Sequence, residues 1–313
     1  MSIPTQYERL RVTTLASGED LFIPVHRLQG ASPGPTLGLS ALVHGDEPLP
    51  NEVVRRVLSS VEPARLRGSI LAIPVANPLA FQSLSRNTPI DMLDINRLFP
   101  GDPGGWLSEQ MAHVLSTQFI PRVDVHVDLH SGGTFPTVDY VYLFEGSRDL
   151  SVAFGSHLLF SPAQPYQGTF AEPARARGIP FFTAELGGGS LLDARYIDKG
   201  VRGVTNVLKQ LGMLDGPVER PAVQTIVTEM AVIRPRVGGV LYPEVGLDCL
   251  GQEVPGGTLL GRVVSPYTFE TLEEIHQPFE RGYMILLRGA ITRVNPGDYA
   301  YMVGNAITAR PAE

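Results

Sequence analysis

Short apolar runs alternate with stretches of helical spacing through roughly the first 220 residues of the chain. The runs lack the polar alternation of a strand with one solvent-facing side, so we expect strands that are buried on both faces. Such strands, alternating with helices, are typical of an α/β fold with a mostly parallel or mixed central sheet and helices on both faces. The runs are TLGLSALV (36–43), SILAIPV (69–75), VDVHVDL (123–129) and IPFFTAEL (179–186), and the helical stretches are EVVRRVLSSV (52–61), WLSEQMAHVLSTQFI (106–120) and YIDKGVRGVTNVLKQLGML (196–214).

The pattern changes after a proline-containing connector, DGPVERPAV (215–223). Beyond it, β-rich runs are punctuated by glycine, as in VGGVLYPEVGLDCLGQEVPGGTLLGRVVSP and GYMILLRGAITRVNPGDYAYMV. Short strands separated by glycine turns indicate a small all-β unit. We therefore expect a catalytic α/β domain over residues 1–220 and a small C-terminal β-rich domain, barrel-like or sandwich-like, over residues 221–313.

Composition narrows the class of protein. With 313 residues, of which 43% are hydrophobic, the chain can bury a substantial core. Its net charge of -7 comes without a basic block, which argues against nucleic acid as a partner. The N-terminus lacks the apolar core of a signal peptide, and no apolar stretch approaches membrane-spanning length, so we expect a soluble cytoplasmic protein without a membrane partner. The single cysteine, Cys249, cannot form an intrachain disulfide.

Reactive side chains follow three of the apolar runs. Ligands of open α/β sheets bind outside the carboxyl ends of the strands. His44 and Glu47, in HGDE, follow the first run, and His130 follows VDVHVDL. A lone HxxE pattern is common by chance, but two histidines and a glutamate together have the composition of a hydrolytic zinc site with an open position for water. Glu185, near the end of IPFFTAEL, would stand beside this site as the general base.

Two other polar residues share the strand face of His130. His126 lies roughly 13 Å further from the strand end, at about 3.3 Å per residue, so we interpret it as a core histidine and not as a ligand. Asp128 lies closer to the end. It is our candidate for a carboxylate behind the metal site that holds a ligand imidazole in its metal-binding tautomer. The alternative for Asp128 is an ordinary buried aspartate that bonds a loop.

The segment between the two histidines adds SRNTPIDMLDINRLFPG (85–101). Taken in order, HGDE, DINRLFPG, DLH and a late ExG resemble the succinylglutamate desuccinylase/aspartoacylase family, which is related to zinc carboxypeptidases. The resemblance spans the α/β domain, and the β-rich tail is similar to the C-terminal domain of that family. It implies a zinc carboxypeptidase-like fold and one Zn²⁺ per chain on His44, Glu47 and His130, with Glu185 activating the bound water.

The same resemblance assigns roles to three polar residues of this segment. It implies that Asn96 and Arg97 hold a substrate carboxylate and that Arg86 polarises the scissile carbonyl. Arginine suits a bidentate contact with a carboxylate, which a lysine cannot reproduce. Without the resemblance, both arginines would be interpreted as solvated loop residues.

The function that these residues indicate is a zinc-dependent amidohydrolase that removes an acyl group from a small N-acyl amino acid or a derivative of one. A carboxypeptidase acting on small peptides would use the same zinc, glutamate and arginines, so it remains an alternative. A non-enzymatic carrier of the biotinyl or lipoyl type is disfavoured, because the last lysine of the chain is Lys209 and the β-rich tail has none. The family also implies that a homo-oligomer is possible.

Overall fold

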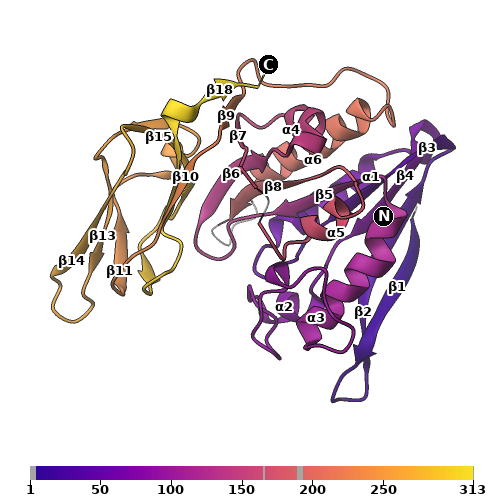
Figure 1. Ribbon diagram of the computed structural model, residues 1–313, viewed down its shortest axis with the longest axis horizontal. Helices are drawn as coiled ribbons and strands as arrows, with labels where there is room; N and C mark the ends of the chain where they lie inside the picture. The colour runs from indigo at the N-terminus through magenta and orange to yellow at the C-terminus, as the bar shows by residue number, and fades with distance from the viewer. Residues whose placement is uncertain (1–4, 165, 189–192, 313) are drawn as a thin grey trace.

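The computed structural model describes residues 5–164, 166–188 and 193–312. A large mixed β-sheet runs through them (Figure 1). In spatial order, the strands of its α/β part are β1 (Gln6–Thr14), β2 (Asp20–Gln29), β4 (Arg67–Ile73), β3 (Ser32–Ser40), β5 (Val125–His130), β8 (Phe181–Gly188) and β6 (Thr137–Tyr142), and β7 (Leu158–Phe160) pairs with β6. Strands β4, β3, β5 and β8 are parallel neighbours, whereas β1, β2 and β6 join antiparallel. The predicted mixed α/β fold is confirmed.

Helices cover both faces of this sheet. They are α1 (Leu49–Ser60), α2 (Pro78–Ser83), α3 (Leu107–Val114), α4 (Arg148–Ala153), α5 (Ala171–Arg175) and α6 (Ala194–Gln210). Helices α1, α4 and α6 contribute to the hydrophobic core on one face, and α3 and α5 contribute to the core on the other. Within the described ranges, no helix is both long and apolar enough to cross a membrane.

Strand β5 shows how the two cores divide the side chains. Val127 and Leu129 pack into the core beneath α1 and α6. Because successive side chains of a strand point to opposite faces, Asp128 and His130 face the other way. Both nevertheless remain buried. A strand buried on both faces explains why this part of the sequence reads as an almost uninterrupted apolar run.

From Thr225 onward the described residues form strands and short 3₁₀ turns. The strands are β9 (Thr225–Val227), β10 (Met230–Ile233), β11 (Gly239–Pro243), β12 (Glu253–Pro255), β13 (Leu259–Val264), β14 (Thr271–His276), β15 (Arg281–Leu287), β16 (Thr292–Val294), β17 (Tyr301–Asn305) and β18 (Arg310–Pro311). Strands β14, β13, β11 and β16 form a second, antiparallel sheet, and a hydrophobic core of its own lies within this part of the chain. The predicted C-terminal β unit is present.

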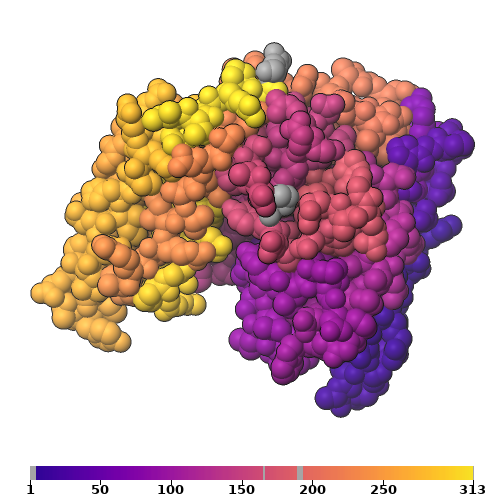
Figure 2. Space-filling model, viewed as in Figure 1, coloured from indigo at the N-terminus to yellow at the C-terminus, as the bar shows by residue number. Residues whose placement is uncertain are grey.

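This unit is joined to the α/β part by strand pairing. Strand β15 pairs antiparallel with β6, where Leu286 lies opposite Val138, and β9 pairs with β7. The central sheet therefore continues into the C-terminal lobe, which stands beside the α/β part in Figure 2. The boundary at residue 220 stays a prediction, because the sheet itself does not stop there.

Candidate functional site

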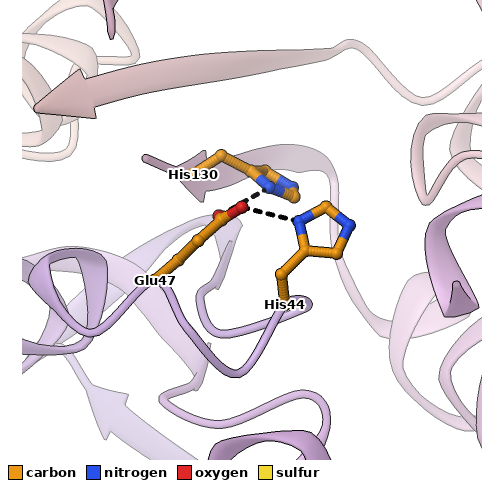
Figure 3. Close-up of side chains that lie close together, drawn as sticks. All are labelled: His44, Glu47 and His130. Atoms are coloured by element: carbon orange, nitrogen blue, oxygen red, sulfur yellow. Dashed lines mark hydrogen bonds and ion pairs between the residues drawn. The ribbon is translucent and has the colours of Figure 1, made fainter. Parts of the chain in front are cut away.

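The three predicted metal ligands meet at the carboxyl ends of β3 and β5. The loop after β3 carries His44 and Glu47, and His130 is the last residue of the parallel strand β5. His44 Nδ1 lies 2.7 Å from Glu47 Oε1, and His130 Nδ1 lies 3.0 Å from Glu47 Oε2 (Figure 3). One ligand atom from each residue falls within 4.8 Å of the others, and all three side chains are buried.

The loop that carries the first two ligands is tightly constrained. Gly45 donates its N–H to the carbonyl of Ser85 at 2.9 Å. A Cβ at this position would lie 1.9 Å from the carbonyl carbon of Ala80, so only glycine fits between His44 and the neighbouring helix α2. Leu42, three residues before Gly45, adopts a left-handed φ of 53° although it is fully buried. Such backbone strain is typical of functional sites.

Two aspartates hold the ligand imidazoles from behind. Asp128 Oδ2 lies 2.9 Å from His130 Nε2, and Ser40 Oγ donates to the other oxygen of Asp128 at 2.5 Å. Asp94 Oδ1 lies 3.1 Å from His44 Nε2 in the same way. A carboxylate on Nε2 fixes the tautomer in which Nδ1 is the free ligand atom. The role of Asp94 was missed, although it is the first residue of the DINR motif that drew attention to this segment.

The charges of the cluster are strongly coupled. Burial alone would raise the pKa of Glu47, but His44 and His130 hold that pKa well below its usual range. Burial alone would likewise lower the pKa of His130, but the carboxylates of Asp128 and Glu47 raise it well above its usual value. The site therefore stabilises positive charge at the point where the two Nδ1 atoms converge.

This arrangement fits a divalent metal. Two imidazole nitrogens and one carboxylate, each oriented by a further group, form the donor set of hydrolytic zinc sites. His126 is excluded from the set, because its ring packs against Phe119 and Phe170 and Ser40 Oγ lies 2.8 Å from its Nε2. Burial lowers the pKa of His126 to about 4, which leaves it neutral in the core. Its interpretation as a core histidine is confirmed.

Glu185 lies beside this cluster on strand β8. In the sheet register it stands opposite His130 of β5 on one side and Tyr140 of β6 on the other. Burial raises the pKa of Glu185 to about 7; His130 opposes this shift and the charge of Glu47 adds to it. A carboxylate with a pKa near neutrality is suited to general acid–base catalysis.

Arg86 and Arg97 occupy different places around the cluster. Arg86 forms an ion pair with Asp94 Oδ2 at 3.0 Å, and its Nη1 lies 3.8 Å from Glu47 Oε1, so its guanidinium adjoins the ligands. Arg97 lies in a 3₁₀ turn, Ile95–Arg97, and donates to the carbonyl of Asn96 at 2.7 Å. Asn96 Oδ1 accepts from the N–H of Phe170 at 2.9 Å, which leaves its amide NH₂ as the group it can offer to a ligand.

A pocket of about 280 Å³ contains all eight predicted site residues in its lining. Its remaining walls are largely aromatic and apolar. They include Tyr140 and Tyr142 of β6, Phe144 and Tyr166. The C-terminal lobe closes one side with a further set of residues, none of which the sequence analysis singled out. That set is Val232, Arg234, Leu286, Tyr299 and Met302.

Comparison with known proteins assigns the chain to a family. The model of the succinylglutamate desuccinylase/aspartoacylase catalytic domain matches residues 33–211, more than half of the 313 residues. The chain belongs to this family. The predicted resemblance is thereby confirmed.

Individual relatives of the family align along almost the whole chain. A structure of a succinylglutamate desuccinylase/aspartoacylase from Rhodobacter sphaeroides is 27% identical, with a TM-score of 0.83, and the match covers 96% of this chain and 95% of that one. The product-bound ectoine utilization protein EutE of Ruegeria pomeroyi shares the fold, with 24% identity, a TM-score of 0.85 and coverage of 97% and 100%. The N-alpha-acetyl-L-2,4-diaminobutyric acid deacetylase of Halomonas elongata is 27% identical over 291 residues, 88% of this chain and 83% of that protein.

Membership in the succinylglutamate desuccinylase/aspartoacylase family places the pocket among those of deacylases. The Halomonas relative is named as a deacetylase, so hydrolytic removal of acyl groups is supported for this chain. The family match includes the loop after β3, the DINR segment and the ends of β5 and β8. The C-terminal lobe lies outside the matched domain, although it contributes residues to the pocket.

The cluster predicts one divalent metal ion per chain, because its three donors converge at a single point. His44→Ala and His130→Ala should each reduce the bound metal, measured by elemental analysis of the purified protein, from about one ion per chain to background. His276→Ala, which changes an exposed histidine of β14, is the matched control and should retain the metal. Full metal content in both site variants would mean that the ion binds elsewhere.

Proposed function

We propose that this chain is a zinc-dependent amidohydrolase that removes the acyl group from a small N-acyl amino acid or a derivative of one. The observation that carries the proposal is the buried His44–Glu47–His130 cluster with Glu185 next to it in the same pocket. The proposal extends the family's deacylase character to a metal, a base and a class of substrate. One zinc per chain, a cytoplasmic location and a possible homo-oligomer belong to the same proposal.

Zinc bound by the three ligands would supply a Lewis acid that polarises a carbonyl and acidifies water. Glu185 then takes the proton of the attacking water and passes it to the leaving nitrogen. Its near-neutral pKa supports both halves of this transfer, because the group is readily ionised and readily protonated again. Asp94 and Asp128 keep the two imidazoles oriented while charge changes beside them.

Arg86 is the residue proposed to polarise the scissile carbonyl. Its guanidinium is fixed by two bonds to Asp94, at 3.2 and 3.0 Å, and adjoins the metal ligands. A preorganised cation in this position would donate to the oxygen on which negative charge develops during amide cleavage, at no cost of reorientation. The pairing with Asp94 supports a fixed arginine in place of the solvated loop residue that its sequence context alone would suggest.

Asn96 and Arg97 are the proposed carboxylate contact. Both line the pocket, and no ion pair of the described ranges includes Arg97. The Arg97 guanidinium beside the buried amide NH₂ of Asn96 offers a substrate carboxylate charge-assisted hydrogen bonds. Holding the amino-acid half in this way would fix the scissile amide against the reacting groups.

A carboxypeptidase acting on small peptides is the second candidate within the same chemistry. The pocket favours the deacylase, because residues of the C-terminal lobe close one side of a space of only about 280 Å³. Comparison of N-acyl amino acids with dipeptides and tripeptides in a release assay for free amine would separate the two. A carrier function has no support from the site, whose buried ionisable cluster is unlike a surface attachment point.

Glu185→Gln should keep the fold and the metal while kcat falls by at least about a hundredfold, because the amide cannot accept the proton of water. In the unaltered enzyme kcat/KM should rise with pH up to about 7, because Glu185 must be ionised to accept the proton. A bound dication would stabilise the ionised carboxylate and so move this rise in kcat/KM to lower pH. Glu280→Gln, at an exposed position, is the matched control. Turnover near that of the unaltered enzyme in Glu185→Gln would transfer the role of base to another group, with Asp46 and Glu172 next to be tested.

Arg97→Met tests the recognition of the carboxylate. A charge-assisted hydrogen bond contributes about 1.5 to 3 kcal/mol, so kcat/KM for an N-acyl amino acid should fall by roughly tenfold to a few hundredfold. The corresponding carboxamide should be a poor substrate for the unaltered enzyme and almost indifferent to the substitution. Arg65→Met is the matched control. It changes an exposed arginine that is not part of the pocket lining, so it should change neither the rate for the acid nor that for the carboxamide. Equal hydrolysis of acid and carboxamide by the unaltered enzyme would show that Arg97 does not read the carboxylate.

A further inference from the structure

One wall of the pocket is a continuous row of aromatic rings. Tyr140 and Tyr142 point to the same side of β6, and Phe144 lies two residues beyond the end of the strand. The rings of Tyr142 and Phe144 are stacked at 5.9 Å with an angle of 3° between their planes, and Tyr166 meets Tyr142 edge-on at 6.1 Å and 88°. We call Tyr140, Tyr142, Phe144 and Tyr166 the aromatic wall. It begins beside Glu185, the register partner of Tyr140, and runs away from the reacting centre.

The aromatic wall adjoins the proposed carboxylate contact. The loop that carries Tyr166 is bonded to the DINR segment twice, by Phe99 N–H to the carbonyl of Gly168 at 3.0 Å and by Phe170 N–H to Asn96 Oδ1 at 2.9 Å. In an amino acid the carboxylate and the side chain stand on the same carbon. The amide nitrogen stands on that carbon too, but the proposed reaction places the scissile carbonyl at Arg86 and the metal cluster. With the carboxylate held at Asn96, the amino-acid side chain is then the group left to face the wall.

The charges around the pocket disfavour a cationic side chain there. The acidic residues of the lining are Glu47, Asp128 and Glu185, and each belongs to the metal cluster or to the proposed proton transfer. Two guanidinium groups of the lining, those of Arg97 and Arg234, take part in no ion pair of the described ranges. An ammonium group against this wall would meet positive charge without a carboxylate to bind it.

A carboxylate side chain is disfavoured for a different reason. The wall itself offers only tyrosine hydroxyls as donors, and that of Tyr140 already donates to Tyr142 at 3.0 Å. Arg234, from the C-terminal lobe, stacks its guanidinium 4.1 Å from the ring centroid of Tyr299 and donates to the carbonyl of Gly297. Of the two lining guanidinium groups that are outside ion pairs in the described part of the chain, that of Arg97 is assigned to the substrate's main carboxylate and that of Arg234 is held against Tyr299 and Gly297. A second carboxylate moved from water to the aromatic wall would therefore carry a large desolvation cost. An aromatic side chain, by contrast, gains offset-stacked and edge-on contacts with these rings.

Phe144 also closes the far end of this wall. It is the residue shared between the pocket and an adjoining hollow of about 490 Å³. On its other side its ring packs against Phe181 at 4.8 Å, and apart from Glu145 and Arg175 the hollow beyond is lined by small or apolar residues. Removal of this one ring would therefore join two spaces that are separate in the structure.

We infer that the aromatic wall is the side-chain subsite of this enzyme, that it takes uncharged aromatic or long aliphatic amino-acid side chains, and that Phe144 sets the length they can have. The inference rests on the proposed deacylase function. It makes the substrate different in class from the one for which the Halomonas relative is named, because 2,4-diaminobutyric acid carries an amine on its side chain.

The first experiment measures kcat/KM of the metal-loaded enzyme for the N-acetyl derivatives of phenylalanine, aspartate and 2,4-diaminobutyric acid. The phenylalanine derivative should exceed each charged one by at least about tenfold, the discrimination expected when a site cannot pair a polar group. A rate for either charged derivative equal to or above that of phenylalanine would overturn the inference, and a preference for diaminobutyrate would mean that the rings bind a cation. Failure to hydrolyse any N-acyl amino acid would instead refute the proposed function, which keeps the two failures distinguishable.

The second experiment tests Phe144 itself. Phe144→Ala should raise the ratio of kcat/KM for N-acetyl-biphenylalanine to that for N-acetyl-phenylalanine by at least about tenfold, because the side chain can extend into the joined hollow. Phe144→Leu, which keeps an apolar side chain against Phe181, should raise the same ratio by a smaller factor and provides the test if the alanine variant does not fold. Tyr267→Ala, which removes an exposed aromatic ring of the C-terminal lobe, should leave the ratio at its original value.

A parallel series varies the acyl group of N-acyl-alanine from acetyl to octanoyl. The ratio of octanoyl to acetyl should not change in Phe144→Ala, because the inference assigns this wall to the amino-acid half. A gain confined to the acyl series would overturn the assignment, as would an unchanged biphenylalanine ratio in folded, metal-loaded Phe144→Ala and Phe144→Leu. Thermal unfolding and metal content of each variant establish that the proteins compared are folded.

Discussion

The carboxylate of Glu47, buried between the Nδ1 atoms of His44 and His130, is the interaction on which the rest of the site depends. An isolated carboxylate in such a place would be strongly destabilising, so its burial requires compensating charge. The imidazoles supply part of that compensation, and Asp94 and Asp128 orient them from the far side. The three carboxylates around the two imidazoles, those of Glu47, Asp94 and Asp128, strongly favour additional positive charge between them. The proposed dication would supply this positive charge, bound by the Nδ1 atoms of His44 and His130 and by Glu47.

The topology of the fold brings these charged side chains together. Parallel strands β3, β5 and β8 end at the same edge of the sheet, so residues from distant parts of the sequence become neighbours. The register places Glu185 opposite His130, while the strained loop at Leu42 and the glycine at position 45 bring His44 back over the sheet. Strand β6 then carries Tyr140 and Tyr142 of the aromatic wall, and its pairing with β15 joins the C-terminal lobe, which contributes residues to the pocket lining. The proposed reaction centre and the proposed side-chain subsite therefore lie on adjacent strands of one sheet.

Features of the fold and the site that leave a local signal in the sequence were predictable. Apolar runs predicted the strands, and polar residues at their ends predicted the cluster of His44, Glu47 and His130. Asp94 was missed because its contact with His44 joins residues fifty positions apart through a loop, where no periodicity marks the partner. The aromatic wall was missed because the alternation in TVDYVY has meaning only once the strand's neighbours are known. The continuation of the sheet through β6 and β15 is likewise a long-range pairing that a single sequence does not specify.

We propose that the buried cluster of His44, Glu47 and His130 binds one zinc ion while Asp94 and Asp128 orient the two imidazoles. Anomalous X-ray diffraction from crystals of the zinc-loaded protein, recorded on both sides of the zinc absorption edge, tests this claim most directly. We expect a single anomalous peak per chain, enclosed by His44 Nδ1, His130 Nδ1 and the carboxylate of Glu47. The absence of a peak at this position in crystals of the zinc-loaded protein, or a peak at other residues only, would contradict it.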